Sequence, residues 1–273
     1  MIDQVKRLIE RHFNEIPLSI TEVTQGSWEK NRGSFLVELK EKRVKVIILP
    51  TESRIKEIVE FCKILKELTP KILHSDKNYM ITEWLAGTVF PEEDLPKTII
   101  QEVAEFQARL HKQMVSYNDS EIIEDTKRQI QDTLNFVLEN NKILPDEFNF
   151  LQNYFEMNFP ESPEISLIHG DFNIDNLIKT NYDWKSIDNE RLHISLTGMD
   201  LDKPLKNICQ TEENKKIYLD AYDKIKPIKF YKKDEIFYRL LFYLHRLRLM
   251  IKYKKDDRIL KEQKRLRNVI TSI

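Results

Sequence analysis

The chain has 273 residues and a mass of 32.8 kDa, enough for one large domain or for two lobes with a sizeable core. The charges of its 44 basic and 45 acidic side chains nearly cancel, so the net charge does not favour nucleic acid or a membrane surface as a partner. With 5 glycines and 10 prolines, the composition excludes a linker or low-complexity protein. The two cysteines, Cys62 and Cys209, lie far apart and form no C-x-x-C motif. We therefore expect neither a disulfide framework nor a zinc site, and a cytoplasmic location.

The first 86 residues have the pattern of a small, strand-rich lobe. Apolar periodicities predict, in chain order, a helix over 2–14, strands over 18–24, 35–39 and 43–49, a helix over 51–68, and a hairpin of strands 71–74 and 79–83. After residue 86 the pattern changes to a helical one. We therefore expect a domain boundary there, with an N-terminal lobe over 1–86 and a C-terminal lobe over 87–273.

The connection between the first two strands, residues 25–34, contains two of the five glycines, Gly26 and Gly33. One interpretation is a simple hairpin turn. The other is a flap whose backbone N–H groups approach phosphates closely, with Ser27 among the residues that bind them. The segment does not match G-x-x-x-x-G-K-[ST], so a Walker-type phosphate loop is not supported.

Lys45 lies between two valines in the expected third strand. A lysine in an apolar strand is usually the alternate residue that faces solvent. In a kinase-like lobe the same residue reaches the α- and β-phosphates of the nucleotide. Glu57 or Glu60, on the helix that follows, could hold this lysine, and we choose Glu57.

The segment Glu83-Trp84-Leu85 ends the strand-rich region. A connection between two lobes is a favoured place for a ligand, and its backbone N–H and C=O groups can bind an adenine edge. We therefore expect this segment to contact the base of a nucleotide.

The C-terminal lobe is expected to be mostly helical. Its apolar periodicities predict helices over 97–115, 121–140, 145–158, 203–208, 212–224, 233–253 and 257–271. Short strands are expected around residues 167–178, and strands 177–179 and 184–187 form a hairpin. No apolar run approaches the length of a membrane span. The last helices are locally basic, which usually marks a solvated face and less often attracts an anionic substrate or partner.

The strongest chemical signal is His169-Gly170-Asp171, followed after four residues by Asn176. The protein-kinase catalytic loop has the same spacing, H-R-D-x-x-x-x-N. Phosphoryl transfer needs a carboxylate that orients a hydroxyl and accepts its proton, and magnesium prefers carboxylate and amide oxygens. Asp171 would be the base, and Asn176 and Asp188 the magnesium ligands, because the 177–187 hairpin would bring Asp188 back beside Asn176. Read alone, the motif is also a common kind of turn.

Together these segments resemble the aminoglycoside phosphotransferase/choline kinase superfamily of small-molecule kinases. The resemblance runs from the glycine region to about Asp202. The segments that carry it are Val44-Lys45-Val46, the helix of Glu57, residues 79–87, Ala108-Arg109-Leu110-His111, His169-Gly170-Asp171-Phe172 with Asn176, Ile187-Asp188-Asn189-Glu190, and Met199-Asp200-Leu201. Any one of them is weak evidence, but their order and spacing together are specific.

The resemblance implies an α+β, bilobal, protein-kinase-like fold with a small antiparallel sheet and a larger helical lobe. It implies Mg²⁺ and ATP, with GTP as the alternative nucleotide. The implied roles are Asp171 as catalytic base, Asn176 and Asp188 as metal ligands, Lys45 with its partner Glu57 on the phosphates, residues 83–85 as the hinge, and Asp200 as a brace of the catalytic loop. The chain departs from the family at Asn189, where an aromatic residue or glycine is usual, and its C-terminal helices match no pattern that identifies the acceptor.

The expected function is phosphoryl transfer from ATP to a hydroxyl of a small molecule, such as a sugar, an amino alcohol or an aminoglycoside. The expected partners are a nucleoside triphosphate and that acceptor, without nucleic acid or membrane. Only eleven residues separate Asp188 from Asp200, and no Ala-Pro-Glu occurs there, which argues against a protein kinase. The alternative is a catalytically inactive, kinase-like nucleotide-binding or interaction module.

Overall fold

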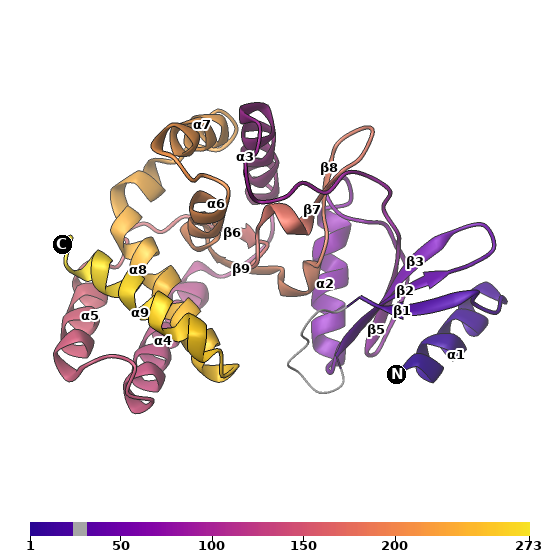
Figure 1. The fold of residues 1–273 in the computed structure, drawn as a ribbon, viewed down its shortest axis with the longest axis horizontal. Helices are drawn as coiled ribbons and strands as arrows, with labels where there is room; N and C mark the ends of the chain where they lie inside the picture. The colour runs from indigo at the N-terminus through magenta and orange to yellow at the C-terminus, as the bar shows by residue number, and fades with distance from the viewer. Residues whose placement is uncertain (24–31) are drawn as a thin grey trace. The chain divides into compact units, whose positions relative to one another are not determined.

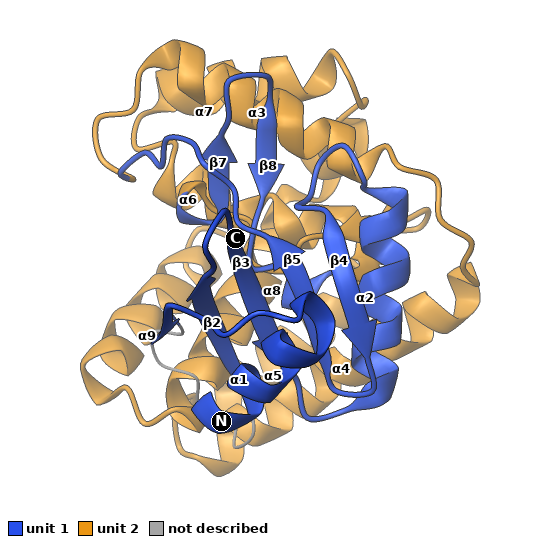
Figure 2. Cartoon of the chain, turned by 90° about the vertical axis from the view of Figure 1, so that its right-hand side faces the viewer, with its two compact units in different colours: residues 1–91, 175–192 blue, residues 92–174, 193–273 orange. Residues whose placement is uncertain are grey.

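The computed structural model describes residues 1–23 and 32–273. Ser27, which we expected to bind phosphate, lies in the segment 24–31 and therefore outside the described residues. The described residues form two compact units (Figure 2). Unit 1 comprises residues 1–91 and 175–192, and unit 2 comprises residues 92–174 and 193–273. The expected division at 86/87 placed 175–192 in the second lobe, whereas the structure groups this segment with the N-terminal sheet.

Unit 1 contains a five-stranded antiparallel sheet with the strand order β1-β2-β3-β5-β4 (Figure 1). In chain order its elements are α1 (Ile2–Phe13), β1 (Ser19–Glu22), β2 (Gly33–Glu38), β3 (Arg43–Ile48), α2 (Glu52–Ile64), β4 (Ile72–Asp76) and β5 (Tyr79–Glu83). Each of these elements was predicted from apolar periodicity to within a few residues. The small antiparallel sheet of the expected fold class is confirmed.

The two faces of this sheet differ in what covers them. One face packs on α1 through fully buried side chains, among them Ile9, Phe35 and Ile81. Successive side chains in a strand point to opposite faces. Lys45 therefore lies on the other face, although its neighbours Val44 and Val46 are part of the α1 core. This alternation places a cation on the face that α1 leaves uncovered.

The segment 175–192 joins unit 1 through backbone hydrogen bonds. It begins within the 3-10 turn η1 (Ile174–Asn176) and contains β7 (Leu177–Lys179), β8 (Trp184–Ser186) and the short 3-10 helix η2 (Asn189–Arg191). β7 and β8 form the predicted hairpin, with Leu177 opposite Ser186. Ser186 N–H donates to Leu68 O at 2.8 Å, and Thr88 N–H donates to Lys179 O at 2.9 Å. These bonds explain why the hairpin belongs with the sheet.

Unit 2 is mostly helical, as expected. Its elements are α3 (Lys97–His111), α4 (Asp119–Glu139), α5 (Pro145–Met157), β6 (Ile165–Ile168), β9 (His193–Leu196), η3 (Thr197–Asp200), α6 (Asp202–Asn207), α7 (Glu212–Asp223), α8 (Lys229–Lys252) and α9 (Asp256–Ile270). Strand β9 was not predicted, and it pairs antiparallel with β6. Helix α8 begins earlier than the predicted residue 233 because it continues across a kink at Asp234, where φ is −116°. No helix among the residues that the structure describes is long and apolar enough to cross a membrane.

Asp202, the first residue of α6, is a buried acid with a measurable consequence for stability. Its Oδ1 accepts a hydrogen bond from Tyr231 OH at 3.1 Å. Burial raises the pKa of Asp202 to about 7, and the Tyr231 hydrogen bond offsets only part of that rise. The folded chain therefore holds a proton on Asp202 at pH values where the unfolded chain has already lost it. This contribution to stability is complete at low pH and is lost as the pH rises through about 7.

We therefore expect Asp202→Asn to raise the free energy of unfolding at pH 8 and to change it little near pH 4. A pKa shift from 3.8 to about 7 corresponds to a gain on the order of 4 kcal/mol, at 1.36 kcal/mol per pKa unit. Urea unfolding of the wild type and the variant at pH 4, 6 and 8 measures it. A variant that is less stable than the wild type at pH 8 would show that the ionised carboxylate stabilises the fold.

Candidate active site

The segment His169-Gly170-Asp171 forms a turn directly after β6, in unit 2. Gly170 has φ of 72°, in the left-handed region that glycine adopts without steric cost. The turn leaves the Asp171 side chain 36% exposed, whereas His169 is fully buried. Asp171 Oδ1 is ion-paired with Lys203 Nζ from α6, a partner that the sequence did not indicate.

Asp200 holds this turn in place. Its two carboxylate oxygens accept hydrogen bonds from the backbone N–H groups of His169 and Gly170, both at 3.0 Å. The side chain is 4% exposed and also lies 3.2 Å from His111 Nε2. Burial by itself would raise the pKa of Asp200, but the hydrogen bonds from His111 and His169 outweigh it and hold the pKa below its ordinary value. The expected bracing role of Asp200 is confirmed.

A second layer of buried polar groups supports Asp200. Gln107 Nε2 donates to Asp200 O at 2.7 Å, and Tyr218 OH donates to Gln107 Oε1 at 2.6 Å. Burial lowers the pKa of His111 more than Asp200 raises it, so the ring is neutral near pH 7. It then accepts from Tyr222 OH at Nδ1, over 2.7 Å, and donates to Asp200 through Nε2. His111 is thus part of a structural network, which α3 and α7 supply.

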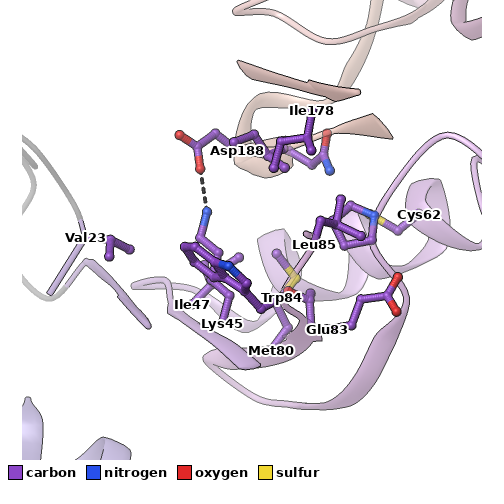
Figure 3. A pocket seen from close by; sticks show the side chains of 14 residues that line it. Val23, Lys45, Ile47, Cys62, Met80, Glu83, Trp84, Leu85, Ile178 and Asp188 are labelled. Atoms are coloured by element: carbon purple, nitrogen blue, oxygen red, sulfur yellow. Dashed lines mark hydrogen bonds and ion pairs between the residues drawn. The ribbon is translucent and has the colours of Figure 1, made fainter. Parts of the chain in front are cut away.

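Unit 1 contains a cavity of about 770 Å³, its open mouth included (Figure 3). Most of the lining is apolar. The lining residues are Val23, Lys45, Ile47, Cys62, Pro70, Met80, Thr82, Glu83, Trp84, Leu85, Ile178, Ile187, Asp188 and Asn189. The sheet face opposite α1 thus provides one wall, and the β7–β8 hairpin with the residues after it provides another.

Lys45 and Asp188 form an ion pair at this cavity (Figure 3). The lysine side chain is 13% exposed and the carboxylate 52% exposed. Asp188 has φ of 55° and ψ of 42°, a left-handed conformation that costs a residue other than glycine on the order of 1 kcal/mol. Such strain is concentrated at ligand-binding and active sites. The structure therefore brings together two of the residues that sequence analysis selected.

The expected pair of Lys45 and Glu57 does not form in this structure. Glu57 is ion-paired with Arg54, three residues earlier on α2, because residues at that spacing are neighbours on a helix. Arg54 also donates to two backbone carbonyls, that of Glu190 at 2.8 Å and that of Leu192 at 2.8 Å. Arg54, which sequence analysis missed, therefore ties α2 to the segment that follows Asp188. The role of Glu57 in nucleotide binding stays a prediction.

Asn176 and Asp188 lie at the two ends of the β7–β8 hairpin. Ile187 N–H donates to Asn176 O at 2.8 Å, so the backbone of Asn176 is paired with the residue directly before Asp188. An aspartate carboxylate and an asparagine amide are hard oxygen donors, which suit magnesium. The half-exposed Asp188 carboxylate already accepts a cationic partner in Lys45. The donor set therefore fits a magnesium ion that takes its remaining ligands from phosphate and water. The part of the chain that the structure describes contains no group of three or more His, Cys, Asp or Glu suited to a metal.

The segment Glu83-Trp84-Leu85 lines the cavity, and its role as a hinge that binds the base stays a prediction. Glu83 N–H donates to Lys71 O at 3.0 Å, and Trp84 N–H donates to Arg43 O at 3.3 Å. The Glu83 carboxylate accepts from Lys71 N–H at 2.8 Å. The backbone N–H groups of Glu83 and Trp84 and the Glu83 side chain therefore already form hydrogen bonds within unit 1. This leaves the Leu85 N–H as our candidate donor for a nucleotide base.

Comparison with known proteins gives one family and one fold. A family model described as "Phosphotransferase enzyme family" matches residues 29–223. No protein with a curated function matches the chain significantly in sequence. Among solved structures, the choline kinase LicA from Streptococcus pneumoniae is 15% identical, with a TM-score of 0.74 over 100% of this chain and 99% of that one.

Two further solved structures have the same fold. The putative fructosamine-3-kinase from Haemophilus somnus 129PT is 15% identical, with a TM-score of 0.66 over 98% of this chain and 97% of that one. The GDP and kanamycin complex of APH(2")-IIia is 15% identical, with a TM-score of 0.71 over 98% of this chain and 99% of that one. Structural similarity to proteins of 15% sequence identity establishes the fold. The expected bilobal kinase-like architecture is therefore confirmed.

Proposed function

Since the chain belongs to the phosphotransferase enzyme family, we propose that it transfers the γ-phosphoryl group of a nucleoside triphosphate to a hydroxyl group of a small molecule. The observation that supports this most directly is the pair of aspartates with different surroundings. Asp171 is partly exposed on a turn that Asp200 holds rigid. Asp188 is strained, half-exposed and paired with a lysine at the mouth of an apolar cavity.

The cavity of unit 1 is the proposed nucleotide site. Its apolar lining, with Ile47 and Met80 from the sheet and Ile178 from the hairpin, suits the two faces of a purine. The Leu85 N–H would donate to the edge of the base. Lys45 would contact the phosphates and exchange its carboxylate partner for a phosphate oxygen. Asp188 and Asn176 would hold a magnesium ion, which when bound neutralises charge on the phosphate oxygens.

Asp171 is the proposed general base. It would accept a hydrogen bond from the acceptor hydroxyl and take its proton as the hydroxyl oxygen bonds to the γ-phosphorus. The bond from that phosphorus to the bridging oxygen breaks in the same step, and the nucleoside diphosphate leaves. Lys203 is ion-paired with Asp171 and would help to hold its carboxylate in place.

ATP is the nucleotide we propose, and GTP is the alternative. The GDP bound in the APH(2")-IIia complex makes GTP the second nucleotide to test. The small molecules named for the similar structures include choline and kanamycin, which differ greatly in size and functional groups. The fold therefore leaves the acceptor of this chain open within the class of small hydroxylated molecules.

Calorimetric titration of the full chain with ATP and with GTP, each with and without magnesium, tests the proposal. We expect one of the two to bind with a 1:1 stoichiometry and to require magnesium for full affinity. Release of the diphosphate is then followed in the presence of candidate acceptors. Binding of neither nucleotide would overturn the proposed function and leave the interaction module as the better interpretation.

A further inference from the structure

Helix α6 connects the proposed base to a group of cationic side chains. Lys203 and Lys206 are three residues apart on this helix and are therefore neighbours on its surface, with about 5–6 Å between their Cβ atoms. Lys203 is ion-paired with Asp171. Lys206 Nζ lies 3.6 Å from Glu262 Oε1 on α9. All of these residues belong to unit 2.

Three cations meet at the single carboxylate of Glu262. Besides Lys206, Arg246 from α8 lies 3.4 Å from Glu262 Oε1, and Arg265 from α9 lies 2.9 Å from it. We call Lys206, Arg246 and Arg265, together with Glu262, the cationic cluster. Three positive charges against one negative charge leave a surplus of two, although the chain as a whole has a net charge of −1. The cluster is therefore a local concentration of positive charge.

The cluster lies in a partly desolvated setting. Glu262 is 2% exposed, and the three cationic side chains are 18–28% exposed, so an outside molecule can reach them. The rings of Phe242 and Tyr243 each lie 5.4 Å from Lys206 Nζ. Burial lowers the pKa of Lys206 to about 8, and the charges of Arg246 and Arg265 act in the same direction, against the opposite effect of Glu262.

Two buried polar atoms of the cluster form no hydrogen bond. Among the described residues, Arg246 Nε and Glu262 Oε2 are buried and have no hydrogen-bond partner. Like charges held close together in a partly buried setting disfavour one another, and a bound anion would compensate them. Guanidinium groups also match the planar geometry of carboxylate and the oxygens of phosphate. The surplus positive charge and the exposed parts of the two guanidinium groups thus suit an anionic ligand.

We propose that the cationic cluster binds an anionic group, a carboxylate or a phosphate, of the acceptor molecule. This rests on the proposed function, because it takes the hydroxyl of that acceptor to reach Asp171. The acceptor is then a hydroxylated anion, such as a sugar phosphate or a hydroxy acid. A polycation would meet surplus charge of its own sign and is excluded.

The charge of the acceptor can be varied in matched pairs. Each acceptor is incubated with the enzyme, magnesium and the nucleotide that binds, and release of the nucleoside diphosphate is measured. The acceptors are glycerol and glycerol 3-phosphate, glucose and glucose 6-phosphate, and ethanolamine. We expect the anionic member of a pair to be the better substrate. Arg265→Met should raise its KM about tenfold, the effect of roughly 1.4 kcal/mol, without a similar change in kcat. Arg265→Met leaves two cations on Glu262, so loss of folding is not expected, and the thermal midpoint of each variant checks this.

Two further variants separate a ligand site from a merely structural network. Lys264→Met removes an exposed lysine from the same helix and should leave the KM unchanged. Glu262→Gln raises the surplus to three positive charges and should lower the KM for the anionic acceptor, whereas a structural network would give lower stability and no gain in affinity. If Lys264→Met raised the KM as much as Arg265→Met does, the effect would be general electrostatic attraction and the proposal would be wrong.

Calorimetric titration with inorganic phosphate, without nucleotide, tests the cluster independently of turnover. Phosphate binding that Arg265→Met weakens, together with turnover of hydroxylated anions, supports the proposal. Phosphate binding without such turnover overturns it, because the cluster is then an anion site unrelated to the acceptor. Nucleotide binding with turnover of cationic or neutral acceptors alone overturns it and leaves the proposed function intact. Absence of nucleotide binding overturns both.

Discussion

Asp171→Asn is expected to lower the rate of phosphoryl transfer by at least about a thousandfold, roughly 4 kcal/mol in barrier height. The amide has the shape of the carboxylate but cannot accept the proton of the acceptor hydroxyl. The turn itself should persist, because Asp200 still accepts from the N–H groups of His169 and Gly170. The measurement is the rate of diphosphate release with the best acceptor found, and with water where none is found.

The same loop provides a matched control for this variant. Asp175→Asn removes an exposed carboxylate four residues further along and should leave the rate close to that of the wild type. Nucleotide affinity is the second control, since Asp171 is not part of the cavity lining. Turnover of Asp171→Asn within a few fold of the wild type would show that another group is the base.

Asp188→Ala is expected to abolish the part of nucleotide affinity that depends on magnesium. The variant loses the proposed carboxylate ligand and leaves Lys45 without its partner, so the lysine stays available to the phosphates. We therefore expect the dissociation constant with magnesium to rise about a hundredfold or more, roughly 2.7 kcal/mol, and the value without magnesium to change little. Calorimetric titrations with and without magnesium measure both quantities.

The two aspartate variants test separate roles. Asp171→Asn should bind nucleotide normally and fail to transfer, whereas Asp188→Ala should fail already at metal-dependent binding. Unchanged affinity of Asp188→Ala for the magnesium complex of the nucleotide would remove Asp188 from the metal site. Loss of affinity that is equal with and without magnesium would instead indicate that the left-handed backbone at Asp188 holds the cavity wall in shape.

Much of the architecture follows from local pattern. Alternation in β3 placed Lys45 on the face opposite Val44 and Val46, and helical periods located the helices α1 to α9. These features depend on neighbouring residues only, which is why one sequence suffices for them. Strand β9 was missed because its four residues are stabilised by pairing with β6, which lies far away in the chain.

The candidate site was predictable where its residues lie close together in the chain. The spacing of Gly170, Asp171 and Asn176 is local, and so is the hairpin that returns the chain from Asn176 to Asp188. The left-handed conformation of Gly170 agrees with a glycine at that turn. Local spacing therefore nominated these residues, and the family resemblance supported the roles proposed for them in catalysis and metal binding.

Only the tertiary structure decided which charges meet. It paired Lys45 with Asp188 and Glu57 with Arg54, and it placed Lys203 on Asp171 across 32 positions of the chain. It also attached the 175–192 hairpin to the N-terminal sheet. Charged side chains are plentiful in this chain, so the choice among many equivalent partners is set by backbone packing and not by any local pattern. The sequence by itself determined the chemistry that is available, and the fold determined where that chemistry converges.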